Sequence, residues 1–209
     1  MVKKFTEIKD SGKRQNFDTG SKRDTDEGKG NPHLIAGETF IRVKDYRKTK
    51  GSAYERKDFK NKCTKYRVSS AIEDCLWNYT KLVESREDNL WYIYEAIDLT
   101  CILIALDEDK DYYSAYTRLA IHYQNGAKKY DANNWRLGQP VSRYFDSANR
   151  HLWKLLAGYK DEDHYAALLW NLVAIVQTKI DVDRKILPES LNNYPYTLSE
   201  VFKNKRKKK

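Results

Sequence analysis

The sequence predicts an all-α protein: a helical bundle of about five helices with an irregular, polar N-terminal arm. Between residues 62 and 180, apolar and aromatic residues recur at spacings of three and four, the period of a helix with one buried face. No run alternates apolar and polar residues in the way of a half-buried strand. The first 62 residues are mostly polar, so the core has to come from the segment that follows them.

Five segments carry this helical period. They are residues 62–83, 89–106, 111–124, 140–157 and 161–180, and a further short helix is expected from about residue 198. The second segment is apolar nearly all round, so we expect it at the centre of the bundle. Gly126 is expected to stop the third helix, and Pro140 suits the first turn of the fourth.

The chain divides into an N-terminal arm, a helical domain and a basic tail. We assign residues 1–62 to the arm, 63–202 to the domain and 203–209 to the tail. Residues 1–32 have almost no apolar side chains and cannot bury enough surface to fold alone. They are either a disordered terminus or a lid that wraps over the body and covers a ligand. Residues 33–62 are predicted to continue as an irregular, lysine-rich segment.

The formal net charge of +9 is concentrated at the C-terminus. Six of the last seven residues are Lys or Arg, so the rest of the chain carries only +3, the difference between 9 and 6. High basicity is therefore weak evidence for nucleic-acid binding, beyond a non-specific attraction of the tail for polyanions. No apolar run approaches the roughly 18 residues that cross a bilayer, so we expect no membrane association and a cytoplasmic protein.

Cysteine usage excludes two classes of small scaffold. Cys63, Cys75 and Cys101 are odd in number, widely spaced and without a C-x-x-C pair. This argues against a disulfide framework and against a zinc knuckle. Cys75 and Cys101 lie in apolar helical patterns, so we expect them to be small buried residues.

The fifth predicted helix combines polar groups with an apolar run. His164 and Asn171 are seven residues apart and share a face. Asp161, Glu162 and Asp163 fall at its start, where carboxylates are common as caps that suit the helix dipole. Asn171 lies inside the apolar run and requires hydrogen-bond partners there. Capping and a polar pocket therefore both explain this segment.

The fourth predicted helix offers a matching face. Arg143, Asp146 and Arg150 recur on it, with His151 adjoining. An Asp–Arg pair four residues apart is a routine surface contact, and His151 fits a satisfied core histidine. Facing the fifth helix, the same groups can instead hold a divalent cation. Carboxylates suit Mg²⁺ and Mn²⁺, and imidazole extends the choice to Co²⁺ or Zn²⁺. The candidate ligands are Asp146, His151, Glu162, Asp163 and His164.

The segment 126–136 mixes cations with rings that can stack. Its cations can neutralise phosphates, its rings can stack on a base and its amides can read base edges. A surface loop anchored by a Trp explains the same composition. The residues concerned are Lys128, Lys129, Arg136, Tyr130, Trp135, Asn133 and Asn134. A separate acidic pair, Glu95 and Asp98, lies on the apolar helix and would be costly to bury unpaired.

Three blocks of the sequence together resemble the phage dATP/dGTP diphosphohydrolase family, within the MazG-like all-α nucleotide pyrophosphohydrolases. The blocks are SGKRQNFDTGSKRDTDEGKG at 11–30, NGAKKYDANNWRLGQP at 125–140 and SRYFDSANRHLWKLLAGYKDEDHYAALLWNL at 142–172. They cover roughly a third of the chain. The resemblance implies a metal-dependent hydrolase, active in phage nucleotide metabolism in the infected host cytoplasm. It implies cleavage of dATP or dGTP to the monophosphate and pyrophosphate.

The resemblance also implies roles for residues. The matching positions are Lys128, Lys129, Tyr130, Asn134, Trp135, Arg150, His151, Asp161, Asp163, His164 and Asn171. Where many members carry a second histidine, three residues after the first, this chain has Ala167. We expect Asp161, Asp163 and His164 to be catalytic. Arg136, Arg143 and Arg150 join the substrate-binding set, and Arg23 and Lys29 are expected to close over the triphosphate.

The leading hypothesis is hydrolysis of a purine nucleotide, with Mg²⁺, Mn²⁺ or Co²⁺ as cofactor. Such enzymes commonly assemble as dimers or tetramers, so we expect a homo-oligomer. An alternative is a non-catalytic nucleotide-binding phage protein that sequesters a host defence signalling nucleotide. A third hypothesis is an accessory protein that binds nucleic acid through residues 203–209.

Overall fold

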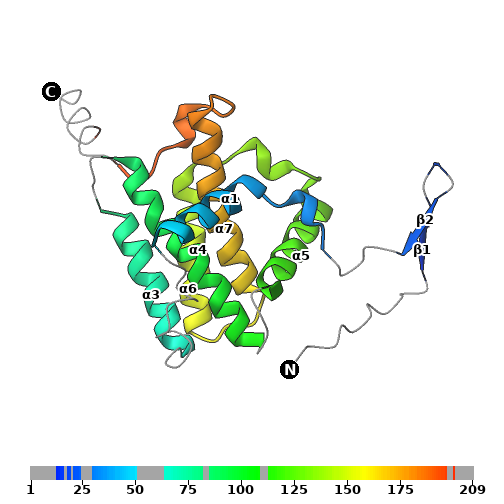
Figure 1. The fold of residues 1–209 in the computed structure, drawn as a ribbon, viewed down its shortest axis with the longest axis horizontal. Helices are drawn as coiled ribbons and strands as arrows, with labels where there is room; N and C mark the ends of the chain where they lie inside the picture. The colour runs from blue at the N-terminus through cyan, green and yellow to red at the C-terminus, as the bar shows by residue number, and fades with distance from the viewer. Residues whose placement is uncertain are drawn as a thin grey trace.

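The computed structural model describes residues 13–16, 18–19, 21–24, 30–50, 64–81, 85–108, 113–196 and 200. Over these residues the chain forms a helical bundle preceded by one small hairpin, which confirms the all-α prediction (Figure 1). The α-helices are α1 (Gly37–Lys50), α3 (Lys65–Tyr79), α4 (Arg86–Glu108), α5 (Tyr113–Tyr130), α6 (Val141–Leu156) and α7 (His164–Asp183). Three short 3-10 helices are η1 (Pro32–Leu34), η2 (Asn134–Leu137) and η3 (Glu189–Leu191).

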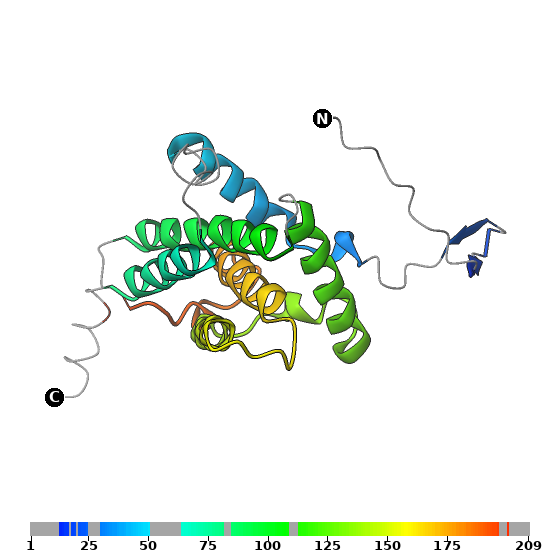
Figure 2. The same cartoon turned by 90° about the horizontal axis from the view of Figure 1, so that it is seen from below.

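Two helices form the centre of the bundle. α4 and α7 pack against each other; α3 packs on α4 and α6 packs on α7. α5 contacts both central helices from one side, and α1 covers them from another (Figures 1 and 2). α7 is buried along nearly its whole length, so it shares the central position that the sequence predicts for α4 alone.

The long apolar segment of α4 is buried in the core of the bundle. Its Asn89–Asp107 segment is long and apolar enough to cross a bilayer by length and composition, but 78% of that window is buried inside the bundle. The acidic pair on this helix has partners on α1. Arg47 forms an ion pair of 2.8 Å with Asp98, whose side chain is fully buried. The Tyr46 hydroxyl donates to Glu95 at 2.8 Å.

Helix α1 corrects the prediction that residues 33–62 are irregular. The face that it turns to the bundle carries Thr39, Val43 and Arg47, spaced four residues apart. Val43 is buried, and the Thr39 hydroxyl donates to Gln177 of α7 at 3.3 Å. Two of these three contacts are polar, so a search for apolar periodicity does not find this helix.

Helix α5 corrects the prediction that Gly126 stops it. The helix continues to Tyr130, and Asp131, with φ of 77°, is the first left-handed residue after it. A Cβ built on Gly126 would meet no atom within 4 Å, so this glycine faces open space. Lys128, Lys129 and Tyr130 therefore lie on the last turn of a helix and not in a loop.

The N-terminal arm contains a hairpin that the sequence analysis does not predict. Strands β1 (Arg14–Asn16) and β2 (Lys22–Asp24) pair antiparallel, and in both views the hairpin stands apart from the bundle (Figures 1 and 2). Strands of three residues are too short to carry an apolar alternation. Lys29, Cys63, the expected helix start at residue 198 and the tail at 203–209 lie outside the described residues.

The arm meets the helical body at Gly30. Gly30 has φ of +76°, and a Cβ on it would lie 2.7 Å from the backbone of Ala120 in α5. The Asn31 amide donates to the Ala120 carbonyl at 3.1 Å, and Gln124 donates to the Asn31 side chain at 3.2 Å. Residues 30 and 31 therefore already pack against the helical body.

Candidate functional site

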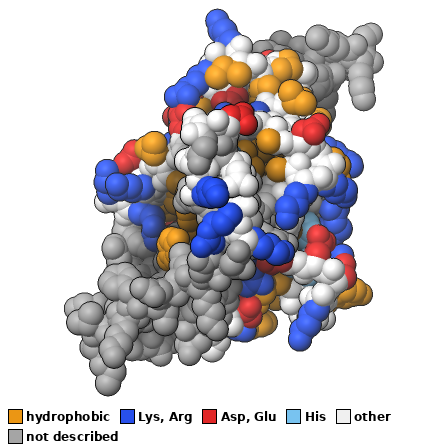
Figure 3. All heavy atoms as spheres, turned by 90° about the vertical axis from the view of Figure 1, so that its right-hand side faces the viewer, with side chains coloured by type: hydrophobic (Ala, Val, Ile, Leu, Met, Phe, Trp, Pro, Cys, Tyr) orange, Lys and Arg blue, Asp and Glu red, His pale blue; other side chains and the backbone are white. Residues whose placement is uncertain are grey.

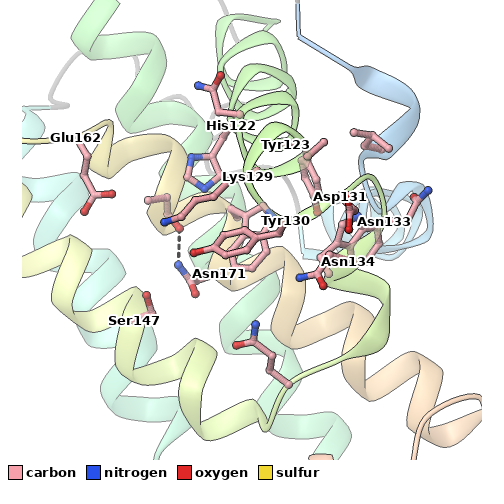
Figure 4. A pocket seen from close by; sticks show the side chains of 18 of the residues that line it. His122, Tyr123, Lys129, Tyr130, Asp131, Asn133, Asn134, Ser147, Glu162 and Asn171 are labelled. Carbon is pink, nitrogen blue, oxygen red and sulfur yellow. Dashed lines mark hydrogen bonds between the residues drawn. The ribbon is translucent and has the colours of Figure 1, made fainter.

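A cavity of about 550 Å³ lies between α5, α6, α7 and the turn that contains η2 (Figure 4). Glu162 stands at one side of it, and Asp131, Asn133 and Asn134 gather at the other. Its lining residues are Leu34, His122, Tyr123, Asn125, Gly126, Ala127, Lys129, Tyr130, Asp131, Asn133, Asn134, Trp135, Gln139, Ser147, His151, Glu162, Ala167, Trp170 and Asn171. The cavity thus has an acidic, histidine-rich end and an amide-rich end.

Three candidate metal ligands meet at the first end. The Nδ1 atoms of His151 and His164 are 3.1 Å apart, and each is 3.6 Å from Oε1 of Glu162. An ion with metal–ligand bonds of about 2.1 Å separates neighbouring ligand atoms by roughly 3.0–3.5 Å. The spacing of these three donors therefore fits a divalent cation.

The environment of His164 sets the orientation of its ring. Its Nε2 lies 2.8 Å from Oδ1 of Asp161, a carboxylate that only accepts, so His164 donates from Nε2. Its Nδ1 then faces Nδ1 of His151 and Oε1 of Glu162. Lys154 donates to the same carboxylate at 2.6 Å, and its hydrogen bond, with that of His164, lowers the pKa of Asp161 to about 2. Carboxylates commonly hold metal-binding histidines in this way.

Burial keeps His151 neutral. His151 is 6% exposed, and desolvation lowers its pKa to about 4. A neutral imidazole is the form that binds a metal ion. Two imidazole nitrogens with one carboxylate oxygen suit Mn²⁺, Co²⁺ or Zn²⁺ better than Mg²⁺, which prefers oxygen ligands.

The structure does not bring the other two candidate ligands to this cluster. Asp163 caps α7 by accepting from the Ala166 amide at 3.0 Å, and it also accepts from Arg118 at 2.6 Å. Asp146 is exposed on α6, is absent from the cavity wall and has Tyr194 as an electrostatic neighbour. The capping interpretation therefore accounts for Asp163.

A polar network fixes the start of α7. Arg118 of α5 contacts both Asp163 and Asp107, at 2.6 and 3.4 Å, and lies 4.7 Å from the centre of the Tyr165 ring. Asp107 also accepts from Lys65 at 2.7 Å and from Tyr165 at 2.9 Å. Four helices thereby hold the turn that presents Glu162 and His164.

Five of the predicted substrate-binding residues line the cavity: Lys129, Tyr130, Asn134, Trp135 and Asn171. The buried Asn171 amide donates to the Ala167 carbonyl at 2.7 Å, which satisfies its nitrogen within α7. Arg150 donates to Ser147 of the cavity wall at 3.0 Å. Lys128, Arg136 and Arg143 are exposed and lie off the wall. The side chain of Arg23 lies outside the described residues, as does all of Lys29.

The two candidate stacking rings have different surroundings. The Arg136 guanidinium lies 4.8 Å from the centre of the Trp135 ring, and Tyr123 meets that ring edge-on at 5.6 Å. Tyr130 is 55% exposed, with the Lys129 ammonium 4.8 Å from its ring centre. Trp135 is therefore largely a packing residue, and Tyr130 is the ring that a base can reach.

His122 is a cavity residue that the sequence analysis does not identify. It points into the cavity from α5 (Figure 4). In a helix that runs to Tyr130, His122, Gly126 and Lys129 share a face at i, i+4 and i+7. Ending the helix at Gly126 conceals that face, whereas extending the helical period by one turn reveals it.

The molecular face seen from the right of Figure 1 carries many Lys and Arg side chains (Figure 3). A concentration of positive charge raises the local concentration of anionic ligands and speeds their arrival. The positive Lys128 and Lys129 at the end of α5 add to this charge near the cavity mouth.

Residues 99–185 match the family model described as dATP/dGTP diphosphohydrolase, N-terminal. This segment contains α5, α6 and nearly all of the cavity wall, and it includes His151, Glu162 and His164. The resemblance that the second and third sequence blocks indicate is thereby confirmed. No curated protein matches the chain. No solved structure matches it.

Proposed function

Because residues 99–185 match the dATP/dGTP diphosphohydrolase family and carry nearly all of the cavity wall, we propose that this protein hydrolyses purine deoxynucleoside triphosphates. The products are the monophosphate and pyrophosphate, and the setting is phage nucleotide metabolism. One observation carries the proposal: two of the three candidate metal ligands, His151 and Glu162, line the same cavity as a stackable ring, and His164 adjoins them. Its volume of about 550 Å³ is in the range of small-molecule sites.

The polarity of the cavity suggests how the nucleotide lies in it. The triphosphate belongs at the end with Glu162 and His151, where Lys129 offsets its negative charge. The base belongs at the end with Asn133 and Asn134, whose amides donate and accept. Tyr130, between the two ends, provides the stacking surface.

His151, Glu162 and His164 would hold the divalent ion, of which Mg²⁺, Mn²⁺ and Co²⁺ are the candidates. When bound, such an ion supplies Lewis-acid polarisation of a phosphoryl group and lowers the pKa of a bound water. In the reaction a water oxygen bonds to the α-phosphorus, and the bond from that phosphorus to the bridging oxygen breaks, releasing pyrophosphate. Asp161 acts through His164 by fixing its ring, and Lys129 compensates phosphate charge.

The test is to incubate the protein with each of the four dNTPs in the presence of Mg²⁺, Mn²⁺ or Co²⁺. We expect monophosphate and pyrophosphate from dATP or dGTP, resolved by ion-exchange chromatography. Glu162→Gln should abolish turnover, and Asp146→Asn, an acidic site off the cavity wall, should leave it unchanged. No monophosphate from any dNTP with any of the metals would contradict the proposal.

A nucleotide-binding protein without turnover is the second candidate. Ala167 favours it, because this cavity residue offers no ligand where many family members carry a histidine. This candidate predicts an unmodified nucleotide, released on denaturing the purified protein and identified by mass spectrometry. Release of monophosphate, or turnover in the assay above, would contradict it.

A further inference from the structure

His122 is a half-buried histidine whose ring nitrogens have no hydrogen-bond partner among the described residues. It lies in the middle of α5 and points into the cavity (Figure 4). The other cavity histidine, His151, uses its Nδ1 within the cluster with His164 and Glu162. His122 is therefore the cavity imidazole that remains available to a ligand.

His122 comes from a different wall of the cavity than the candidate metal ligands. α5 forms one wall of the cavity, whereas His151 comes from α6 and Glu162 from the turn before α7. Glu162, Asp163 and His151 are its electrostatic neighbours. The donors of His151, Glu162 and His164 lie within 4.8 Å of one another, and His122 is not in that group. The imidazole thus faces the cluster without joining it.

Packing against Trp170 supports the ring of His122. The two ring centres are 6.0 Å apart, with 50° between the ring planes. Trp170 in turn meets Tyr123 and Tyr144 edge-on, so it belongs to a packed aromatic group. A side chain supported in this way loses little conformational freedom when it binds a ligand.

We propose that His122 is a further catalytic residue, which donates a hydrogen bond to the α-phosphoryl group of the nucleotide across the cavity from His151, Glu162 and His164. This role rests on the proposed function. Burial lowers the pKa of His122, so the imidazole is neutral at neutral pH and carries one N–H. A positioned donor at the reacting phosphoryl group stabilises the charge that develops there.

The kinetic test compares His122→Ala with His122→Gln. We expect the alanine variant to lower kcat by roughly 100- to 1,000-fold, the usual effect of removing one such donor. The glutamine variant, which keeps an N–H, should recover part of that loss. Calorimetric affinity for Mn²⁺ should stay within about twofold in both, whereas His151→Ala should lose metal binding. His33→Gln, an exposed histidine off the cavity wall, is the matched control.

Two kinetic results would overturn the assignment. One is an alanine variant with unchanged kcat. The other is a Mn²⁺ affinity that falls as far in His122→Ala as in His151→Ala, because His122 would then be a metal ligand.

Nuclear magnetic resonance on ¹⁵N-histidine protein tests the contact without turnover. The chain has four histidines, so single His→Gln variants assign every imidazole signal. We expect Zn²⁺ to shift His151 and His164, and the α,β-methylene analogue of dATP then to shift His122. Shifts at His151 or His164 with the analogue, but none at His122, would sink this inference alone. No shift at any imidazole with the analogue would sink the proposed function together with it.

Discussion

Asp161 shows how one exposed carboxylate controls a buried imidazole. It accepts from Nε2 of His164 and from Lys154, so the His164 ring is held with Nδ1 toward Glu162 and His151. The pKa of Asp161, lowered to about 2, keeps this carboxylate ionised across the physiological range. The orientation of the candidate metal ligand His164 therefore depends on a residue that itself lies outside the cluster.

Asp161→Asn should weaken metal binding while leaving the ligand set intact. The amide loses the charge that supports the Nε2 proton of His164, and changes of this kind typically cost 10- to 100-fold in metal affinity. Isothermal titration with Co²⁺ measures the effect. Asp146→Asn is the matched control on α6, and an Asp161→Asn affinity equal to wild type would show that Asp161 only pairs with Lys154.

Tyr130 is predicted to contribute more to nucleotide binding than an exposed tyrosine off the cavity wall. Tyr130→Ala should weaken binding of a non-hydrolysable dATP analogue by about 1–3 kcal/mol, because its exposed ring is the one a base can stack on. Tyr130→Phe should retain affinity. Fluorescence titration measures both, with Tyr159→Ala as an exposed tyrosine off the cavity wall. Equal losses for Tyr130→Ala and Tyr159→Ala would contradict the stacking role.

At the scale of the elements, α5 places Gly126 within a helix and on the cavity wall. Gly126→Ala should raise the free energy of unfolding by up to about 1 kcal/mol, because alanine is the better helix former and no atom opposes the methyl group. The same methyl group enters the cavity, so affinity for a nucleotide analogue should fall. Thermal denaturation and analogue titration check the two effects, and a lower Tm would contradict the first.

The sequence predicts the helices that pack through an apolar face. It misses the helix that packs largely through polar contacts. α3, α4, α6 and α7 begin and end within a few residues of their predicted bounds, since each buries a run of apolar side chains. α1 is missed because Thr39 and Arg47 join it to the bundle through polar partners on α7 and α4. Those partners are distant in sequence, so no local pattern reveals them.

The candidate site could be predicted only in part from local sequence patterns. His151, Glu162 and His164 were reachable from helical spacing and residue chemistry, and the structure places their donors together. Asp146 and Asp163 have the same ligand chemistry, but Asp146 lies off the cavity wall and Asp163 pairs with Arg118. Predicting His122 as a cavity residue would have required the true end of α5. Gly126, which faces open space, falsely indicated an earlier end of that helix.

At the scale of the whole molecule, Asp107 links four helices through Lys65, Tyr165 and Arg118. Burial alone would raise its pKa, but the hydrogen bonds from Lys65 and Tyr165 outweigh burial and hold the pKa of Asp107 below its usual 3.8. As pH falls, the unfolded chain therefore takes up this proton before the folded protein does. The contribution of Asp107 to stability is full above about pH 4 and is lost as pH falls through the folded pKa.

Asp107→Asn tests this linkage. The variant should be less stable than wild type at neutral pH, and the gap should narrow below about pH 4. Urea denaturation between pH 3 and 7 measures both. Asp45→Asn, an exposed acidic site with a short-range partner on α1, is the control and should show little difference at any pH. A gap that stays constant across the range would contradict the assignment.

Gly30→Ala should loosen the junction between the arm and the bundle. Two effects add: a strained positive φ, costing about 1–3 kcal/mol, and a clash with the Ala120 backbone. Gly158→Ala measures the strain alone, because Gly158 has φ of +77° with nothing within 4 Å of its Cβ. We expect urea denaturation to show a larger loss of stability for Gly30→Ala than for Gly158→Ala, and hydrogen exchange at residues 31–36 to accelerate in Gly30→Ala. Equal losses of stability in the two variants would exclude the clash as a cause.

The unbroken course of α5 has a consequence for how this protein can vary. Ala120, His122, Gly126 and Lys129 occupy one rigid rod, so a single inserted residue would turn everything after it by about 100°. Such an insertion after Ala120 would keep the arm docked and carry Lys129 away from the cavity. Insertions and deletions among related chains should therefore be rare within α5. They should collect instead in the turn from Asp131 to Gln139, where new shapes alter which base fits without disturbing the phosphate end.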